Sequence, residues 1–169
     1  MNSNFRIPRW EELPDVDLYL DQVISLIDSS IGRYVNEDGK KMITRTMVNN
    51  YVKQKIINPP IKKKYDKLTV ASLFVIAILK PVFSMNEISK LITLAMEANR
   101  SEVSYNQFCI VTEEAVEKVF SGESLPERGD LNDPQYILRS VCMTFACKLY
   151  VREIYFNRIE DSEPFIIEY

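Results

Sequence analysis

Apolar residues recur at helical spacing in the first third of the chain. The helical positions after residue 15 are Val16, Leu20, Val23, Ile24, Ile27 and Ile31. Asp15 stands before them and suits an N-cap, so the pattern predicts a helix that begins at Asp15. Gly32 and the turn-forming residues 36–39 interrupt the pattern and predict the end of this helix. Residues 1–14, with two prolines, predict an irregular arm that Trp10 pins to the body.

A second amphipathic segment covers residues 44–56. Its apolar positions gather on one side of a helical wheel: Met47, Val48, Tyr51, Val52 and Ile56. Thr44 is a suitable N-cap, and the prolines at 59 and 60 cannot continue a helix. The segment therefore predicts a helix at residues 44–56. The following stretch, 58–67, fits either a short β-wing or an irregular basic loop.

The next two segments predict a central helix and its neighbour. Residues 68–80 are apolar almost all round, which is typical of a helix in the core, and Pro81 ends it. Ser84 and Glu87 then form the pattern of a capping box, in which each side chain bonds the other residue's backbone N–H. The buried stripe expected on that helix consists of Ile88, Leu91, Ile92 and Ala95.

The last third of the chain also reads as helical. Thr112 suits the N-cap of a helix through Phe120, and a polar loop follows at residues 122–129. Asp133 before Pro134 is a strong helix start. The helix that it begins is expected to reach Asn157, with an apolar stripe of Leu138, Cys142, Phe145, Leu149 and Phe156. The fold class is therefore mainly α, and 169 residues fit one domain with an appendage.

Charge along the chain is unevenly distributed. Residues 40–67 hold nine basic residues and one acid, Asp66, so this basic island carries +8. The whole chain carries −3, which leaves −11 for the rest. The basic residues of the island are Lys40, Lys41, Arg45, Lys53, Lys55, Lys62, Lys63, Lys64 and Lys67. A polyanion would be attracted to this edge of the molecule and repelled by the remainder.

The side chains opposite the apolar side of helix 44–56 suit the major groove of DNA. They are Arg45, Thr46, Asn49, Asn50, Lys53 and Gln54. Amide side chains form paired bonds with adenine, and Arg or Lys with guanine. Lys62, Lys63 and Lys64 follow at the place where a wing would contact phosphates, which gives affinity and register. Tyr65 could either pack in the core or touch a phosphate.

Composition disfavours most enzymatic chemistry. The chain has no histidine, which removes the usual general base and the histidine-containing catalytic triads. The adjacent acids Glu113 and Glu114, or Glu11 and Glu12, do not face each other on a helix. We therefore expect no enzyme, no cofactor and no metal site. The three cysteines predict reduced, partly buried thiols, and the N-terminus has no apolar signal core, so a cytoplasmic protein without a membrane span is expected.

Two resemblances support this interpretation. Residues 46–60 followed by the lysine triplet resemble the recognition helix and wing of MerR-type winged helix-turn-helix regulators, a likeness that covers residues 44–95. The segments 9–19, 50–53 and 62–64 are similar to a bacterial family known as domain of unknown function 1836, over residues 6–160. The MerR resemblance places Asn49 where those proteins carry an arginine, and Tyr51 at a shared tyrosine. Lys55 departs from the pattern because a glycine is usual there.

The function expected from these features is sequence-specific regulation of transcription. Residues 15–96 would form the DNA-binding region around helix 44–56 and the wing 58–67, with double-stranded DNA as partner. Residues 97–169 would serve homodimerisation or sensing, because two half-sites multiply the affinity of a small DNA-reading head. A small-molecule effector stays undetermined, although the aromatic residues of the C-terminal half would suit an apolar pocket. The alternative is a helical protein-interaction module that does not bind DNA.

Overall fold

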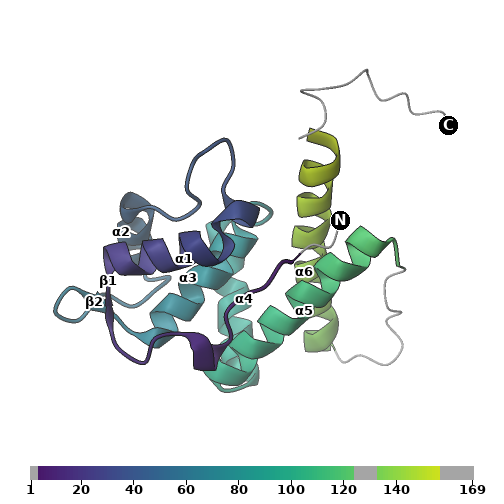
Figure 1. Cartoon of the computed structure of the whole chain (residues 1–169). Helices are drawn as coiled ribbons and strands as arrows, with labels where there is room; N and C mark the ends of the chain where they lie inside the picture. The colour runs from purple at the N-terminus through teal and green to yellow at the C-terminus, as the bar shows by residue number, and fades with distance from the viewer. Residues whose placement is uncertain (1–3, 124–132, 157–169) are drawn as a thin grey trace.

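The computed structural model describes residues 4–123 and 133–156 and is mainly helical, as the sequence predicts (Figure 1). The helices are α1 (Leu20–Val35), α2 (Arg45–Lys53), α3 (Lys67–Leu79), α4 (Met85–Ala98), α5 (Ser101–Ser121) and α6 (Asp133–Val151). Two-residue strands β1 (Leu18–Tyr19) and β2 (Lys64–Tyr65) pair antiparallel, with Leu18 opposite Tyr65. A 3-10 turn, Trp10–Glu12, precedes β1, and a π-helical turn, Arg152–Phe156, follows α6.

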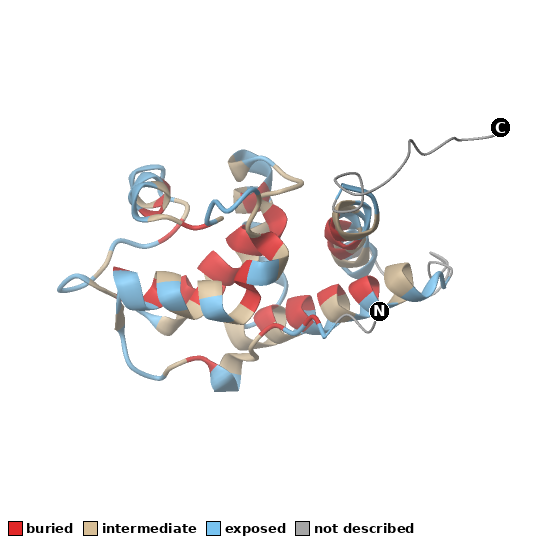
Figure 2. Cartoon of the chain, turned by 45° about the horizontal axis from the view of Figure 1, so that its top comes forward, coloured by how far each residue is buried: buried red, intermediate tan, exposed pale blue. Residues whose placement is uncertain are grey.

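Helix α3 forms the centre of the core, as its apolar sequence predicts. Most of its side chains are buried, and the red ribbon of Figure 2 follows it along most of its length. Asp66 caps its start, because its carboxylate accepts a 2.8 Å hydrogen bond from the Thr69 N–H. Helices α1, α4, α5 and α6 all pack against α3. The helix ends at Leu79, two residues before the proline that the sequence marks as its limit.

Helix α1 begins five residues later than the sequence pattern predicts. Leu20 is its first residue, and Asp15 is not its N-cap. Val16 is 69 % exposed, so it does not belong to the buried stripe. The preceding residues instead form β1, whose backbone pairs with β2 some 45 residues further along the chain. Gly32 lies inside α1 rather than ending it, because the helix continues to Val35.

The N-terminal arm packs onto the body along α5. Phe5, Ile7 and Leu13 are buried, and Trp10 lies edge-on to Tyr105 of α5 with ring centroids 6.2 Å apart. The Trp10 N–H also donates to the Asn106 side chain at 2.8 Å. The arm is therefore anchored by backbone hydrogen bonds and apolar contacts in addition to the tryptophan that the sequence singles out.

Helix α5 is longer than predicted. It starts at Ser101, so Thr112 lies in its interior and does not cap it. The Thr112 hydroxyl is fully buried and donates to the Phe108 carbonyl one turn earlier, at 2.7 Å. The helix ends at Ser121, where Gly122 adopts the left-handed conformation typical of a C-cap. The polar loop expected after it lies mostly outside the described residues.

Helix α6 starts at Asp133, where the Asp–Pro pair predicts it, and packs along α5. It ends at Val151 and a π-helical turn follows, while the predicted end at Asn157 lies outside the described residues. Cys142, Phe145 and Leu149 of the predicted stripe are buried, but Phe156 is 51 % exposed and is not part of it. Cys109 and Cys142 are buried free thiols and Cys147 is exposed. Within 4–123 and 133–156, none of the helices has the length and apolar character of a bilayer span.

Candidate nucleic-acid interface

Helix α2 presents one fixed polar face to solvent. Thr44 caps its start, with its hydroxyl accepting from the Met47 N–H at 3.4 Å. Val48 and Tyr51 are buried, which orients the helix as the sequence predicts. The six polar residues opposite are all exposed: Arg45, Thr46, Asn49, Asn50, Lys53 and Gln54. This polar face of α2 contains amides, a hydroxyl and cations and no carboxylate.

The basic stretch after α2 forms a tight hairpin turn rather than an irregular loop. Ile61 and Lys64 exchange two backbone hydrogen bonds of 2.9 Å. The two residues between them, Lys62 and Lys63, have φ values of 48° and 66°. Positive φ at both central positions is the geometry of a type I′ hairpin turn. This lysine turn, residues 61–64, therefore directs two exposed lysines away from β2.

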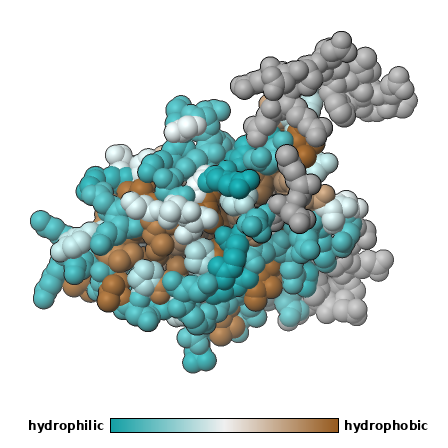
Figure 3. All heavy atoms as spheres, viewed as in Figure 1, coloured by the Kyte–Doolittle hydropathy of each residue, from teal (hydrophilic) through white to brown (hydrophobic). Residues whose placement is uncertain are grey.

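The lysine turn and α2 lie at the same end of the molecule. Figure 1 shows the β1–β2 pair and α2 together on the left, with α6 on the opposite side. Teal side chains protrude at the corresponding left margin of Figure 3. Strand pairing and helix packing explain this arrangement. Strand β2 pairs with the strand directly before α1, and α1 packs against both α2 and β2.

Lys55 adopts a left-handed backbone conformation directly after α2. Its φ is 59°, in the left-handed region where glycine is favoured. The Lys55 N–H bonds the Val52 carbonyl at 3.0 Å, and the Ile56 N–H bonds the Tyr51 carbonyl at 2.9 Å. The turn that ends α2 thus has glycine-like geometry although a lysine occupies it.

Part of the basic island is neutralised by aspartates that precede it in the chain. The ion pairs are Lys41–Asp28 at 2.9 Å, Arg45–Asp21 at 2.5 Å and Lys67–Asp15 at 2.7 Å. Within the described residues, the exposed lysines of the island without an ion pair are Lys40, Lys53, Lys55, Lys62 and Lys63. Both partners of the Arg45 pair are largely exposed, so the pair contributes little to stability and can exchange partners.

Two residues predicted to contact nucleic acid are less available than the others. Tyr65 is only 4 % exposed and packs in the core, which decides between the two roles left open for it. Burial raises the pKa of its hydroxyl. Lys64 is half-buried, and its ammonium group lies 5.0 Å from the centre of the Tyr19 ring. The accessible positive charge of the turn therefore comes from Lys62 and Lys63.

The buried side of α2 packs through apolar side chains. Two polar groups, the Tyr51 hydroxyl and the Lys80 ammonium group, also lie on this side. The Tyr51 hydroxyl is buried and has no hydrogen-bond partner among the described residues, and burial raises its pKa. The Lys80 ammonium group lies 2.9 Å from the Met47 sulfur and 3.5 Å from the Met42 carbonyl. Burial lowers the pKa of Lys80 because a low-polarity environment disfavours its charged form.

Glu113 and Glu12, one from each acidic pair considered as a catalytic candidate, bond arginines of the arm. Both Glu113 oxygens accept from the Arg9 guanidinium, at 2.6 and 2.7 Å, and one also accepts from the Ile7 N–H at 2.7 Å. Glu12 is paired with Arg6 at 2.8 Å, and this pair with the Arg9 N–H lowers the pKa of Glu12. Among the described residues, no cluster of three or more histidine, cysteine or acidic side chains could hold a metal ion.

Residues 8–109 match the family model described as a domain of unknown function (DUF1836). This segment is more than half of the chain, so the protein belongs to that family. The resemblance predicted from the sequence over residues 6–160 is confirmed over residues 8–109. The match includes most of the arm, helices α1–α4 and the first turns of α5. No curated protein and no solved structure matches the chain. The MerR-type resemblance of residues 44–95 stays a prediction.

Proposed function

We propose that this protein is a sequence-specific DNA-binding transcriptional regulator with a winged helix-turn-helix of MerR type. In this proposal α2 reads the major groove and the lysine turn contacts phosphates. The observation that carries it is the polar face of α2, where two adjacent asparagines and a glutamine stand exposed among cations. Amides and cations without carboxylates are the side-chain set that base edges and phosphates require.

The position of charge supports the same proposal. Lys62 and Lys63 are exposed on a hydrogen-bonded turn next to β2, at the end of the molecule that carries α2. The chain outside the basic island carries −11, so a duplex would be attracted only to this end. Arg45 joins the interface by leaving Asp21 for a phosphate or a guanine, an exchange between two exposed partners.

Selection from a random duplex library, followed by fluorescence anisotropy at two salt concentrations, tests the proposal. A palindromic enriched site with steep salt dependence is the expected result, because a dimer reads two half-sites. With about four to six phosphate contacts per protomer, each protomer should contribute about −4 to −5 to the slope of log K against log salt. Weak binding without an enriched sequence would contradict the proposal.

The lysine turn permits a variant that removes charge without disturbing the fold. Lys62→Asn with Lys63→Gly gives the residue pair that a type I′ turn prefers, so the hairpin is retained. We expect weaker binding to all sequences and a salt slope reduced by about 2 per protomer, since each lost phosphate contact removes about 0.9. Lys90→Gln with Lys118→Gln removes the same charge from α4 and α5 and is the matched control.

Asn49→Ala and Asn50→Ala test the reading of bases by α2. Each should reduce the discrimination between the enriched and a scrambled site by about 1–3 kcal/mol, with little change in salt slope. Both side chains are exposed and alanine favours helix, so stability is retained. Asn86→Ala, at an exposed position of α4, is the control. If the asparagine and lysine variants have the same effect on every sequence, α2 does not read bases.

Dimerisation is part of the proposal, with α6 as its interface. The C-terminal end of α6 and the following turn expose a group of apolar side chains: Tyr150, Val151, Tyr155 and Phe156. Light scattering should give the mass of a dimer at micromolar concentration, and a monomer there would contradict this assignment. The same exposed residues favour the alternative function, a helical protein-interaction module, which the absence of any DNA binding would support.

A further inference from the structure

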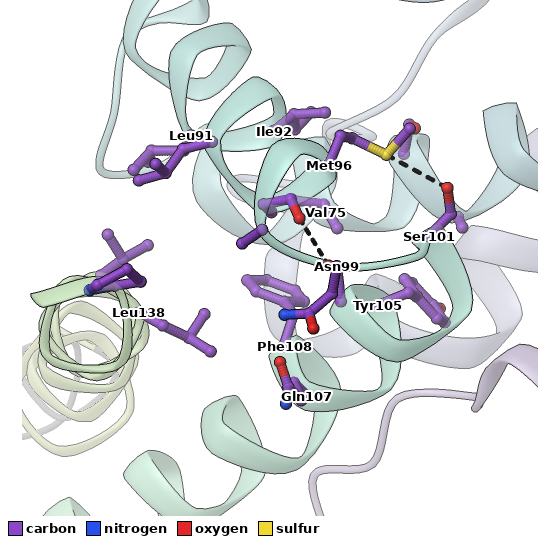
Figure 4. A pocket seen from close by; sticks show the side chains of 18 of the residues that line it. Val75, Leu91, Ile92, Met96, Asn99, Ser101, Tyr105, Gln107, Phe108 and Leu138 are labelled. Atoms are coloured by element: carbon purple, nitrogen blue, oxygen red, sulfur yellow. Dashed lines mark hydrogen bonds between the residues drawn. The ribbon is translucent and has the colours of Figure 1, made fainter. Parts of the chain in front are cut away.

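A cavity of about 520 Å³ opens between α3, α4, α5 and the first turns of α6 (Figure 4). Val75 and Leu79 of α3 and Phe108 of α5 line it, together with Leu91 and Ile92 of α4. Its volume falls within the range of about 300–1,000 Å³ that small-molecule sites occupy. The residues that line it in the described part of the chain belong to none of β1, β2 and α2.

The cavity exists because α4 is incompletely covered. Its apolar stripe predicts four buried residues, but only Ile88 is buried. Leu91, Ile92 and Ala95 are half-buried and line the cavity instead. Across the space, Leu138 and Val141 of α6 supply the opposite apolar side chains. The stripe on α4 therefore faces a hollow rather than another helix.

Among the described residues that line the cavity, none has a charged side chain, although 27 % of the chain is charged. A charged ligand would lose its hydration there without gaining an ionic partner, which is costly. Apolar ligand surface would be favoured by its removal from water. The lining thus selects neutral, mostly apolar molecules.

Most polar groups around the cavity are already engaged. The Ser72 hydroxyl donates to the Leu68 carbonyl at 2.9 Å, and the Tyr105 hydroxyl donates to the Pro8 carbonyl at 2.9 Å. The side-chain amides of Asn99 and Gln107 line the cavity and form no hydrogen bond within the described residues. Two amides beside an apolar hollow can bind one polar group of a ligand and so orient it.

We propose that this cavity is a binding site for a neutral, mostly apolar small molecule that carries one hydrogen-bonding group for Asn99 and Gln107. The inference goes beyond the proposed DNA binding and does not depend on it. The site joins the family-matched part of the chain, through α3, α4 and the start of α5, to α6 outside the match.

Titration of the full chain with two naphthalene dyes tests the charge selectivity of the site. The neutral dye N-phenyl-1-naphthylamine should bind saturably with one dye per chain and a Kd of about 1–100 µM, usual for an apolar ligand of this size. The anionic dye 1-anilinonaphthalene-8-sulfonate should bind at least about tenfold more weakly. Equal affinity for both dyes, or no saturation by the neutral dye, would overturn the proposal.

Ala95→Phe tests the location of the site. The phenyl ring would occupy the cavity and weaken binding of the neutral dye by at least about tenfold. Ile110→Phe is the matched control, because Ile110 is 44 % exposed on α5 and does not line the cavity. The affinity of this variant for the neutral dye should stay within about twofold of that of the unchanged protein. Thermal unfolding verifies that both variants fold, and Ala98→Phe at the exposed rim replaces Ala95→Phe if needed. If the filled and control variants bind the dye equally while the filled variant alone changes oligomeric state, the cavity is a protein contact and not a ligand site.

Discussion

At the scale of single residues, the backbone places lysine where glycine would be less strained. Among the described residues with positive φ other than glycine, three are lysines of the basic island: Lys55, Lys62 and Lys63. A side chain in the left-handed region costs roughly 1 kcal/mol relative to glycine. The positive charges of these three lysines are therefore present although their backbone conformation lowers the stability of the fold. Such a loss of stability is expected at positions that serve function.

Lys55→Gly should increase stability by about 0.5–1 kcal/mol, because it relieves the left-handed conformation at φ 59°. Lys53→Gly, two residues earlier in regular helix, should decrease stability by about the same amount. Urea unfolding of both variants measures the difference. Equal destabilisation by the two glycines would mean that Lys55 is not strained. Both variants lose one positive charge, so Lys55→Gly and Lys53→Gly should weaken DNA binding to a similar extent. Their effects on the free energy of unfolding should have opposite signs.

At the scale of elements, helix ends are well defined by local side chains. The Ser84 hydroxyl accepts from the Glu87 N–H at 3.3 Å, and a Glu87 oxygen accepts from the Ser84 N–H at 2.8 Å. This reciprocal pair at the start of α4 is the capping box that the sequence predicts. The hydrogen bonds from Ser84 lower the pKa of Glu87, because they favour its charged form.

The capping box makes the start of α4 sensitive to acid. A carboxyl group with a folded-state pKa below its ordinary value of about 4.5 stabilises the fold above that pH, and the contribution is lost as pH falls through the folded-state pKa. Glu87→Gln should therefore lower Tm by about 1–3 °C at pH 7 and not at about pH 3. Circular dichroism melts at both pH values measure this. Glu97→Gln, near the end of α4, is the control and should not lower Tm at pH 7. An equal loss at both pH values would exclude the charge of Glu87 as the cause.

Local sequence signals predicted the helix ends that depend on neighbouring residues. They failed where contacts between residues far apart in the chain determine the secondary structure. The caps Thr44 and Ser84 act on residues three positions away, so both are readable in the sequence. Thr112 is a residue type that often caps helices, but here its hydroxyl bonds a carbonyl inside α5. Helix α5 begins earlier, at Ser101, because it packs against the arm and α6. The residues before α1 form a strand only because β2 pairs with them. The polar face of α2 was predictable, whereas the cavity beside α4 depends on where α6 docks.

At the scale of the whole molecule, the two proposed sites are formed by different elements, because no residue of α2, β1 or β2 lines the cavity within the described part of the chain. The lysine turn and α2 form one end, and α6 lies on the opposite side (Figure 1). The arm joins the first residues of the chain to the middle of α5 through Glu113, which lies beyond the family-matched segment. Residues 8–109 alone would therefore lack the acceptor for the Arg9 guanidinium.

Glu113→Ala should lower the free energy of unfolding by about 3 kcal/mol, because it leaves a partly buried guanidinium and a backbone donor without their acceptor. Arg9→Met keeps apolar contacts and should cost less. The double variant should reveal a coupling of about 1–3 kcal/mol between the two residues in urea unfolding. Arg6→Met with Glu12→Gln removes an exposed pair of the same arm and should cost at most about 1 kcal/mol. Additive losses for Arg9 and Glu113 would contradict a direct contact.

The anchoring of the arm also determines the order in which the protein can fold during synthesis. Arg9 leaves the ribosome first, but its acceptor Glu113 is synthesised 104 residues later. At a synthesis rate of about 5–20 residues per second, Glu113 is added to the chain roughly 5–20 s after Arg9. During that time Phe5, which contacts Phe145 of α6 in the finished molecule, and Ile7, which bonds Glu113 of α5, lack these later partners. Closure of the arm onto α5 is thus a late step of folding, and until then the apolar side chains of the arm are open to aggregation and proteolysis.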